Sequence, residues 1–272
     1  MYIKLVIFFI HLVISYHHVH QIGDFLYSFG GYDFTTFKSD VWRFDFEELK
    51  WEMRSSIPDD RGYFSSLLFK NKVYIFGGYD FFHRLATNWI YDPEENKWTA
   101  MTPLSVGRSD SASVIYNGKI LVSGGFDGER TLNRVEVFDP EKPEDGWTDF
   151  APMKDPRSGH AMVVFRDTIF AIGGFQHGTS TDTAEYFDAS CNEWKSAPSM
   201  GSERSTFSAI VFEDAIYTIG GHSLDTSTSV VEKFDGEAWT VVHCLPKAIA
   251  AGAVVYVDNP KNMPKLLQRA NV

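Results

Sequence analysis

Apolar residues along this chain fall in short runs, and the runs come in pairs that are separated by a polar turn. One pair reads SASVIY, NGK, ILVSGG over 111–125, and another reads AMVVF, RDT, IFAIGG over 161–174. Two apolar runs joined by a short turn are typical of a β-hairpin. After each glycine pair the pattern predicts a variable loop, a third strand, a turn and a fourth strand that begins at a tryptophan. The repeating unit is therefore a four-stranded antiparallel meander of about 47 residues.

Three features recur in every unit. The first glycines of successive pairs are 47, 47, 49 and 47 residues apart, and an aromatic residue followed by Asp comes fourteen residues after each of them. The glycine pairs are Gly30-Gly31, Gly77-Gly78, Gly124-Gly125, Gly173-Gly174 and Gly220-Gly221. The tryptophans are Trp51, Trp98, Trp147, Trp194 and Trp239.

A sheet of this kind is apolar on two faces, so it must stack on its neighbours. Five twisted sheets stacked face to face curve around an axis, which predicts an all-β fold, a β-propeller. The glycine doublet that closes the second strand, the aromatic residue of the third and the Trp of the fourth resemble the kelch repeat over residues 16–257. We interpret these residues as structural, because Gly lets a neighbouring backbone approach and the aromatic rings fill the wedge between sheets.

The predicted domain is a kelch-type β-propeller over 16–258, with blades at about 16–56, 57–104, 105–153, 154–200 and 201–246. AGAVVYVD then suggests one extra C-terminal strand over 250–258, and 259–272 is expected to be a loose tail. That strand either joins the first blade and closes a five-bladed ring or begins an incomplete six-bladed ring. Closure is favoured because it removes exposed sheet edges.

The N-terminal segment has the pattern of a signal peptide. MYIK precedes the apolar run LVIFFIHLVI, and Ser15 follows it, which predicts a secretory signal over 1–15. The alternatives are an extra β-strand or a misread gene start. We therefore expect a secreted protein, with a cytoplasmic location as the alternative. The run is too short to span a membrane, so no stable membrane insertion is expected.

Composition narrows the classes of partner. The formal charge of −11 argues against binding to nucleic acid or to anionic membranes, and two cysteines cannot build a disulfide framework. The hydrophobic content of 44% is that of an ordinary globular domain.

A ligand-binding rim is expected where the loops after the glycine pairs meet the loops after the tryptophan strands. Arg61, Arg108, Arg157 and Arg204 each precede a glycine pair by sixteen residues, so four blades place an Arg at one height. The neighbouring rim residues are Tyr32, Tyr79, Phe81, Phe82, Phe126, Phe175, His177 and His222. Such a ring of arginines and aromatics predicts binding of an acidic or phosphorylated peptide. The alternative is that each Arg braces neighbouring loops through Asp.

The sequence contains no recognisable catalytic constellation, and we predict a non-enzymatic protein without a cofactor. His17, His18 and His20 suggest a metal site only weakly, and a solvated strand end is the favoured interpretation. Some kelch-like propellers are copper oxidases with a Cys–Tyr crosslink, but Cys191 and Cys244 fall in a predicted turn and near a strand end, with no convergent His pair evident.

Two functions fit these expectations. The first is a module that binds a protein or peptide across the loop rim, with an acidic or phosphorylated peptide as one candidate. The second, implied by the resemblance to BTB-kelch proteins, is the substrate-recognition part of a cullin-type ubiquitin ligase adaptor that lacks its BTB domain here, or a cytoskeletal (actin) binder.

Overall fold

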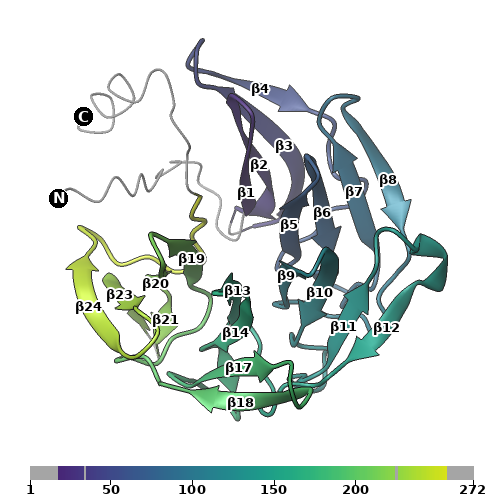
Figure 1. Cartoon of the computed structure of the whole chain (residues 1–272). Helices are drawn as coiled ribbons and strands as arrows, with labels where there is room; N and C mark the ends of the chain where they lie inside the picture. Colours follow the sequence, from purple (N-terminus) through teal and green to yellow (C-terminus); the bar gives the residue numbers. More distant parts are fainter. Residues whose placement is uncertain (1–17, 34, 224–225, 256–272) are drawn as a thin grey trace.

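The structure, a computed structural model, describes residues 18–33, 35–223 and 226–255. Within these ranges the chain forms five four-stranded antiparallel sheets that stand around a common axis like the blades of a propeller (Figure 1). The predicted fold class is therefore confirmed. No helix among the described residues is long and apolar enough to cross a membrane.

Each blade is a meander that runs outward from the axis. The first blade comprises β1 (His18–Ile22), β2 (Phe25–Tyr32), β3 (Phe37–Asp45) and β4 (Lys50–Arg54). The second comprises β5 (Ser65–Phe69), β6 (Lys72–Phe76), β7 (Asn88–Asp92) and β8 (Lys97–Met101). The third comprises β9 (Ala112–Tyr116), β10 (Lys119–Ser123), β11 (Val135–Phe138) and β12 (Trp147–Phe150), with a 3-10 turn at Pro143–Asp145.

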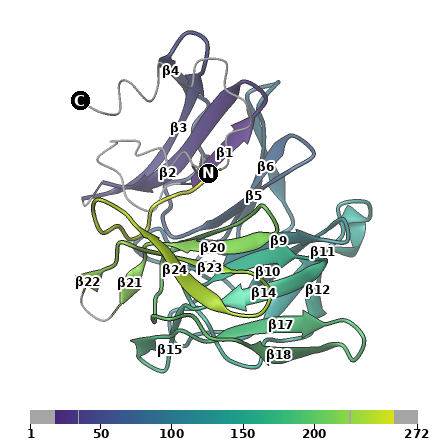
Figure 2. The same ribbon diagram turned by 60° about the vertical axis from the view of Figure 1, so that its left-hand side comes forward.

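The last two blades carry an additional two-stranded hairpin in the loop after the glycine pair. The fourth comprises β13 (Ala161–Phe165), β14 (Thr168–Ile172), β17 (Ala184–Asp188) and β18 (Glu193–Ala197), with the hairpin β15 (Phe175–Gln176) and β16 (Thr179–Ser180). The fifth comprises β19 (Ser208–Phe212), β20 (Ala215–Ile219), β23 (Val230–Phe234) and β24 (Trp239–Cys244), with the hairpin β21 (His222–Ser223) and β22 (Thr226–Ser227). Figure 2 shows the blades from a second direction.

Local sequence explains the turns of each meander. The first two strands of the third blade are joined by Asn117 and Gly118, both with positive φ, as a two-residue hairpin turn of type I′ requires. The turn between the third and fourth strands is held by the Asp of the repeated aromatic–Asp step. In the first blade, Asp45 Oδ1 accepts the main-chain N–H groups of Glu47 and Glu48.

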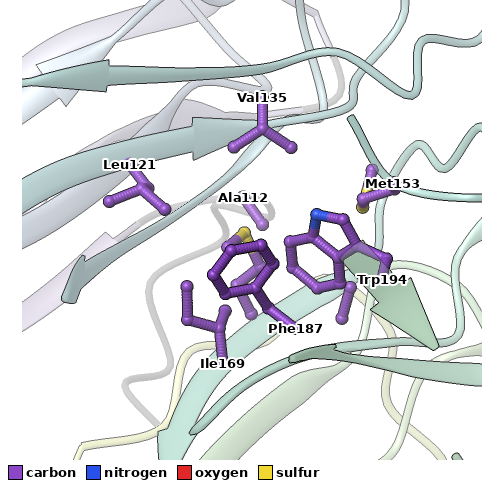
Figure 3. Packing of buried hydrophobic residues seen from close by; sticks show 9 residues of the cluster. Ala112, Leu121, Val135, Met153, Ile169, Phe187 and Trp194 are labelled. Carbon is purple, nitrogen blue, oxygen red and sulfur yellow. The ribbon is translucent and has the colours of Figure 1, made fainter. Parts of the chain in front are cut away.

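Apolar side chains from adjacent blades form the core. Between the third and fourth blades, Leu121 and Val135 face Ile169, Phe187 and Trp194 (Figure 3). The wedge between these sheets is filled by aromatic rings and by Met153 from the connection that joins the blades, so stacking buries both faces of a blade.

The glycine pairs mark the place where neighbouring blades touch through their backbones. Gly124 has φ of 57°, and a Cβ atom there would lie 2.3 Å from the main-chain oxygen of Arg157. Gly125 N–H donates to that same oxygen at 2.8 Å. A side chain at Gly124 would therefore force the third and fourth blades apart.

The prediction of a closing strand over 250–258 is wrong for residues 250–255, the part of it that the structure describes. Residues 250–255 form no strand, and 256–258 lie outside the described residues, as do the predicted signal at 1–15 and tail at 259–272. The polar groups of this segment bond to the fifth blade instead. Ala251 N–H donates to Thr206 O at 2.7 Å, and Ser208 Oγ donates to Gly252 O at 2.7 Å. Among the described residues, no strand pairs with the segment 250–255.

Candidate functional site

The loops after the glycine pairs and the loops after the tryptophan strands do lie on one rim. Isolated antiparallel bridges join them in four blades: Gly62 with Tyr79, Ser109 with Phe126, Ser158 with Phe175, and Ser205 with His222. The rim is therefore built from both sets of loops, as the alternation of a meander requires.

The four repeated arginines do not present their charges on this rim. Arg61, Arg108, Arg157 and Arg204 are each 0% exposed. In every case Nη1 donates to the carbonyl of the first glycine of the same blade, at 2.8 Å for Arg157 and Gly173. The prediction that these guanidinium groups contact a ligand is corrected, and the bracing alternative describes their geometry.

In three of the four blades the carboxylate that pairs with the repeated Arg is a Glu and not the expected Asp. Arg108, Arg157 and Arg204 are paired with buried glutamates of the third strand, Glu136, Glu185 and Glu232. In the second blade Trp89 holds that position, and Arg61 pairs with Asp59. Burial lowers the pKa of the Arg108 guanidinium from its ordinary value, and the Glu136 carboxylate opposes the shift. A buried ion pair of this kind orders the loop because its charges cannot be left unpaired.

An aromatic surface occupies the rim of the first two blades; we define it as Tyr32, Phe37, Tyr79, Phe81 and Phe82. Phe37 is its centre, with ring centroids 4.0 Å from Phe81, 5.2 Å from Tyr32 and 5.8 Å from Tyr79. Phe81 is 44% exposed and Phe82 is 83% exposed. Neighbouring large aromatics that remain open to water on a folded domain are typical of an interaction site.

A tight turn holds the apex of this surface in place. Asp80 Oδ1 accepts the N–H groups of Phe82 at 2.8 Å and His83 at 2.6 Å. Phe81 has φ of 76°, a left-handed conformation that is unfavourable for a residue with a Cβ. The same position in the third blade is Gly128, which adopts this region freely. The second blade thus keeps a strained Phe where glycine would be relaxed.

Arg84, which the sequence analysis did not single out, borders the aromatic surface. Its Cζ lies 3.8 Å from the Tyr79 ring centroid and 5.3 Å from that of Phe126. Its Nε and Nη1 atoms are buried and have no hydrogen-bond partner within the described residues. The guanidinium lies between two rings and forms no ion pair with a carboxylate among the described residues, although its charge acts on the buried Asp110 and lowers the pKa of that carboxyl against the effect of burial. In the sequence, Arg84 differs from the four repeated arginines because it follows a glycine pair, whereas each of those precedes one by sixteen residues.

The remaining predicted rim residues lie on the fourth and fifth blades. Phe175 is 42% exposed at the start of β15, His177 is exposed, and His222 is half-buried in β21. Among the described residues, no ring contact joins them to the aromatic surface. The structure therefore brings Tyr32, Tyr79 and Phe81 into ring contact, places Phe82 next to them and Phe126 against Arg84, and leaves the other three apart.

A cavity of about 290 Å³ lies on the propeller axis, where the first strands begin. Its lining includes Tyr63, Asp110, Ser111, His160 and Thr206. Asp110 is surrounded by protein, and this burial raises the pKa of its carboxyl although Ser109 donates a hydrogen bond to it. Within the described ranges, no group of three His, Cys, Asp or Glu side chains lies close enough to hold a metal ion.

The histidines of the first strand are not a solvated strand end, so that interpretation is corrected. His20 Nε2 lies 2.8 Å from Ser66 Oγ, and His18 stacks on Phe64 with centroids 4.5 Å apart. Burial lowers the pKa of His20 to about 3. A neutral His20 therefore packs between the first two blades, while His17 lies outside the described residues.

Comparison with known proteins identifies the repeats. The family model of the KLHDC2/KLHL20/DRC7 Kelch-repeats domain matches residues 16–221. The solved structure of YjhT is similar over 88% of this chain and 86% of that chain, with a TM-score of 0.78 and 16% sequence identity, which is a likeness of fold. No curated protein matches the chain.

Proposed function

Because this chain belongs to the kelch-repeat family, whose propellers are typically protein-interaction modules, we propose that it is a recognition module for a segment of another protein. The segment binds across the aromatic surface, with Phe82 as the anchor. The observation that supports this proposal is the exposure of Phe82 and Phe81 beside a guanidinium that has no carboxylate partner among the described residues.

The chemistry of the surface suggests the chemistry of the ligand. Phe81 and Phe82 offer apolar area to one or two large side chains, and large rings lose little conformational entropy when they are covered. Arg84 adds a cation that is already oriented by Tyr79 and Phe126. A segment with an apolar residue next to a carboxylate satisfies both features, so an acidic peptide remains the favoured partner, now through Arg84.

Selection from a random peptide display library on the full chain tests this proposal. Peptides that bind should lose affinity by roughly 30-fold or more for Phe82→Ala, because an anchor residue contributes about 2 kcal/mol or more. The matched control is Val241→Ala, which removes an apolar side chain that is 61% exposed on β24, away from the aromatic surface.

Two outcomes would count against the proposal. One is a set of peptides that bind Phe82→Ala as well as the natural chain, and the other is a set that is weakened equally by the Val241 control. Among peptides that depend on Phe82, those with an acidic residue should also be weakened by Arg84→Met.

A further inference from the structure

The loops after the glycine pairs of the first three blades share one kind of turn. It begins at an Asp three positions after the first glycine of the pair; these residues are Asp33, Asp80 and Asp127. In each loop Oδ1 of this Asp accepts the main-chain N–H groups of the residues two and three positions further along, at 2.6–2.9 Å. One short side chain thus fixes the main chain of the turn. We call the residue two positions after the Asp the apex.

The apex residue differs among the three turns. It is Thr35 in the first blade, Phe82 in the second and Glu129 in the third, and all three are exposed. Of these turns, that of the second blade alone places a large apolar side chain in solvent. Among the described residues, the Phe82 ring contacts one other ring, that of His83, at a centroid distance of 6.4 Å. The position of the Phe82 ring therefore depends on the main chain of the turn and not on packing.

Two separate sets of contacts hold the turn of the second blade. Phe81 is fixed by its neighbours, because Tyr79 Oη donates to its main-chain oxygen at 2.8 Å and its ring stacks on Phe37 with an interplanar angle of 23°. The N–H groups of Phe82 and His83 bond to Asp80 Oδ1, and no other group among the described residues accepts them. The Asp80 side chain therefore determines how the main chain continues from the strained Phe81 to the apex.

The charge of the Asp80 carboxylate strengthens these hydrogen bonds. Burial raises the pKa of this carboxyl, but the N–H groups of His83 and Phe82 outweigh burial and hold the pKa below its ordinary value. The group is therefore ionised at neutral pH. Hydrogen bonds from main-chain N–H groups to a charged acceptor are roughly twice as strong as those to a neutral one. Loss of the carboxylate should accordingly free the apex, whereas the stacking of Phe81 on Phe37 does not involve it.

We propose that Asp80 is a positioning residue of the recognition site, which holds Phe82 in place for a bound segment through the N–H groups of Phe82 and His83. This inference rests on the proposed function, because it gives Asp80 a role toward the ligand that Phe82 anchors. A ligand that meets a side chain already in position does not have to order it. The turn therefore strengthens binding by pre-organisation and not by a contact of its own.

The chain offers a conservative variant and a matched control for this proposal. Asp80→Ala removes the acceptor, whereas Asp80→Asn keeps an oxygen at the same place and forms the same kind of turn. Asp92 provides the control, because its Oδ1 accepts the N–H groups of Glu94 and Glu95 in the same way, at 3.0 and 3.1 Å. That turn joins β7 to β8 at the opposite end of the second blade. Asp92→Ala therefore removes an equivalent turn that lies away from Phe82.

The experiment measures the affinity of each full-length variant for a peptide that was selected by display and whose binding depends on Phe82. Asp80→Ala should weaken binding by roughly 10-fold, because the bound peptide must then order the turn. Asp80→Asn should stay within about three-fold of the natural chain, and Asp92→Ala should leave the affinity unchanged. Natural affinity of Asp80→Ala, or equal weakening by Asp92→Ala, overturns the proposal while Phe82 keeps its role as the anchor.

Hydrogen exchange in the free chain tests the same role without a ligand. The amides of Phe82 and His83 should exchange roughly ten times faster in Asp80→Ala than in the natural chain, and Asp80→Asn should restore most of their protection. Equal exchange rates in the natural chain and Asp80→Ala overturn the proposal. A library that yields no peptide dependent on Phe82 is instead a failure of the proposed function, and the positioning role falls with it.

Discussion

The buried guanidinium groups connect main-chain segments that are far apart in the sequence. Arg157 Nη1 donates to the carbonyls of Gly173 and Thr183, which lie sixteen and twenty-six residues further along the chain. The Glu185 carboxylate neutralises the charge. One Arg side chain therefore fixes both ends of the loop that follows the glycine pair. The same arrangement in four blades gives these loops similar positions on the rim.

Loss of one such arginine should destabilise the fold. Arg108→Met leaves Glu136 as an unpaired buried carboxylate, so the free energy of unfolding should fall by about 3–5 kcal/mol in urea denaturation. Arg84→Met is the matched control, since no carboxylate pairs with Arg84 in the described structure, and it should change stability by less than about 1 kcal/mol. Equal stability of the two variants would contradict the brace.

The position of the arginines, but not their burial, could be predicted from the sequence. The sixteen-residue spacing placed all four at the rim. A second spacing would have indicated pairing, because Glu136, Glu185 and Glu232 each follow an Arg by twenty-eight residues. Whether a guanidinium points to solvent or into the blade depends on carbonyls brought near it by folding, which no local pattern records.

A buried histidine gives the fold a pH dependence. His160 is 6% exposed, and burial, aided by the charge of Arg157, lowers its pKa to about 3. Since the folded pKa is below the unfolded value near 6.5, stability is complete above pH 6.5 and is lost as the pH falls toward 3. At pH 5 the loss attributable to His160 should be about 2 kcal/mol.

Replacement of His160 by Phe tests the assignment, because Phe64 and Phe207 hold the same repeat position in the second and fifth blades. The variant should lose less stability than the natural chain between pH 7 and pH 5 in parallel urea titrations. The same pH dependence in both proteins would show that His160 does not titrate in this way.

At the scale of the element, each blade depends on the connection that precedes it. Trp98 shares a buried cluster with Phe29, Ile57 and Tyr91, and its indole N–H donates to Ser55 O at 2.8 Å. Trp51 lies at the same place in the first blade but is 38% exposed. Two tryptophans with one repeat position thus have different surroundings.

Truncation of these two tryptophans should therefore have unequal costs. Trp98→Ala should lower the free energy of unfolding by about 3–5 kcal/mol, as a large core truncation does. Trp51→Ala should cost roughly half as much, because less of its surface is buried. Chemical denaturation of both variants provides the comparison, and a natural stability of the Trp98 variant would argue against the inter-blade packing.

The blades themselves follow from residues that act locally, which is why the sequence predicts them well. Gly124 and Gly125 need positive φ, and the Asp of each aromatic–Asp step makes its own turn. The segment after Leu245 was harder to predict. Its apolar residues are typical of a strand, but a strand also needs a neighbouring strand with free main-chain groups. In each repeat the strand that ends at the glycine pair is that neighbour, and no glycine pair follows residue 245.

At the scale of the whole molecule, exposed aromatic residues are distributed unevenly over the rim of the propeller. The exposed aromatics Phe81 and Phe82 lie together on the second blade. The corresponding loops of the fourth and fifth blades form short hairpins, of which the first carries a single exposed aromatic, Phe175, and the second has only polar residues in its strands. The sequence predicted the rim as a whole. It could not show that one sector of the rim is the aromatic one, because Phe37 reaches Phe81 only when the first two blades stack.

Hydrogen exchange of the full chain with and without a selected peptide tests the central claim, that the aromatic surface is the recognition site. Bound peptide should slow the exchange of amides in residues 79–84 and 35–38 and leave the turns between the third and fourth strands unchanged. Slowed exchange confined to those turns or to the outer strands, with no change in residues 79–84, would contradict it.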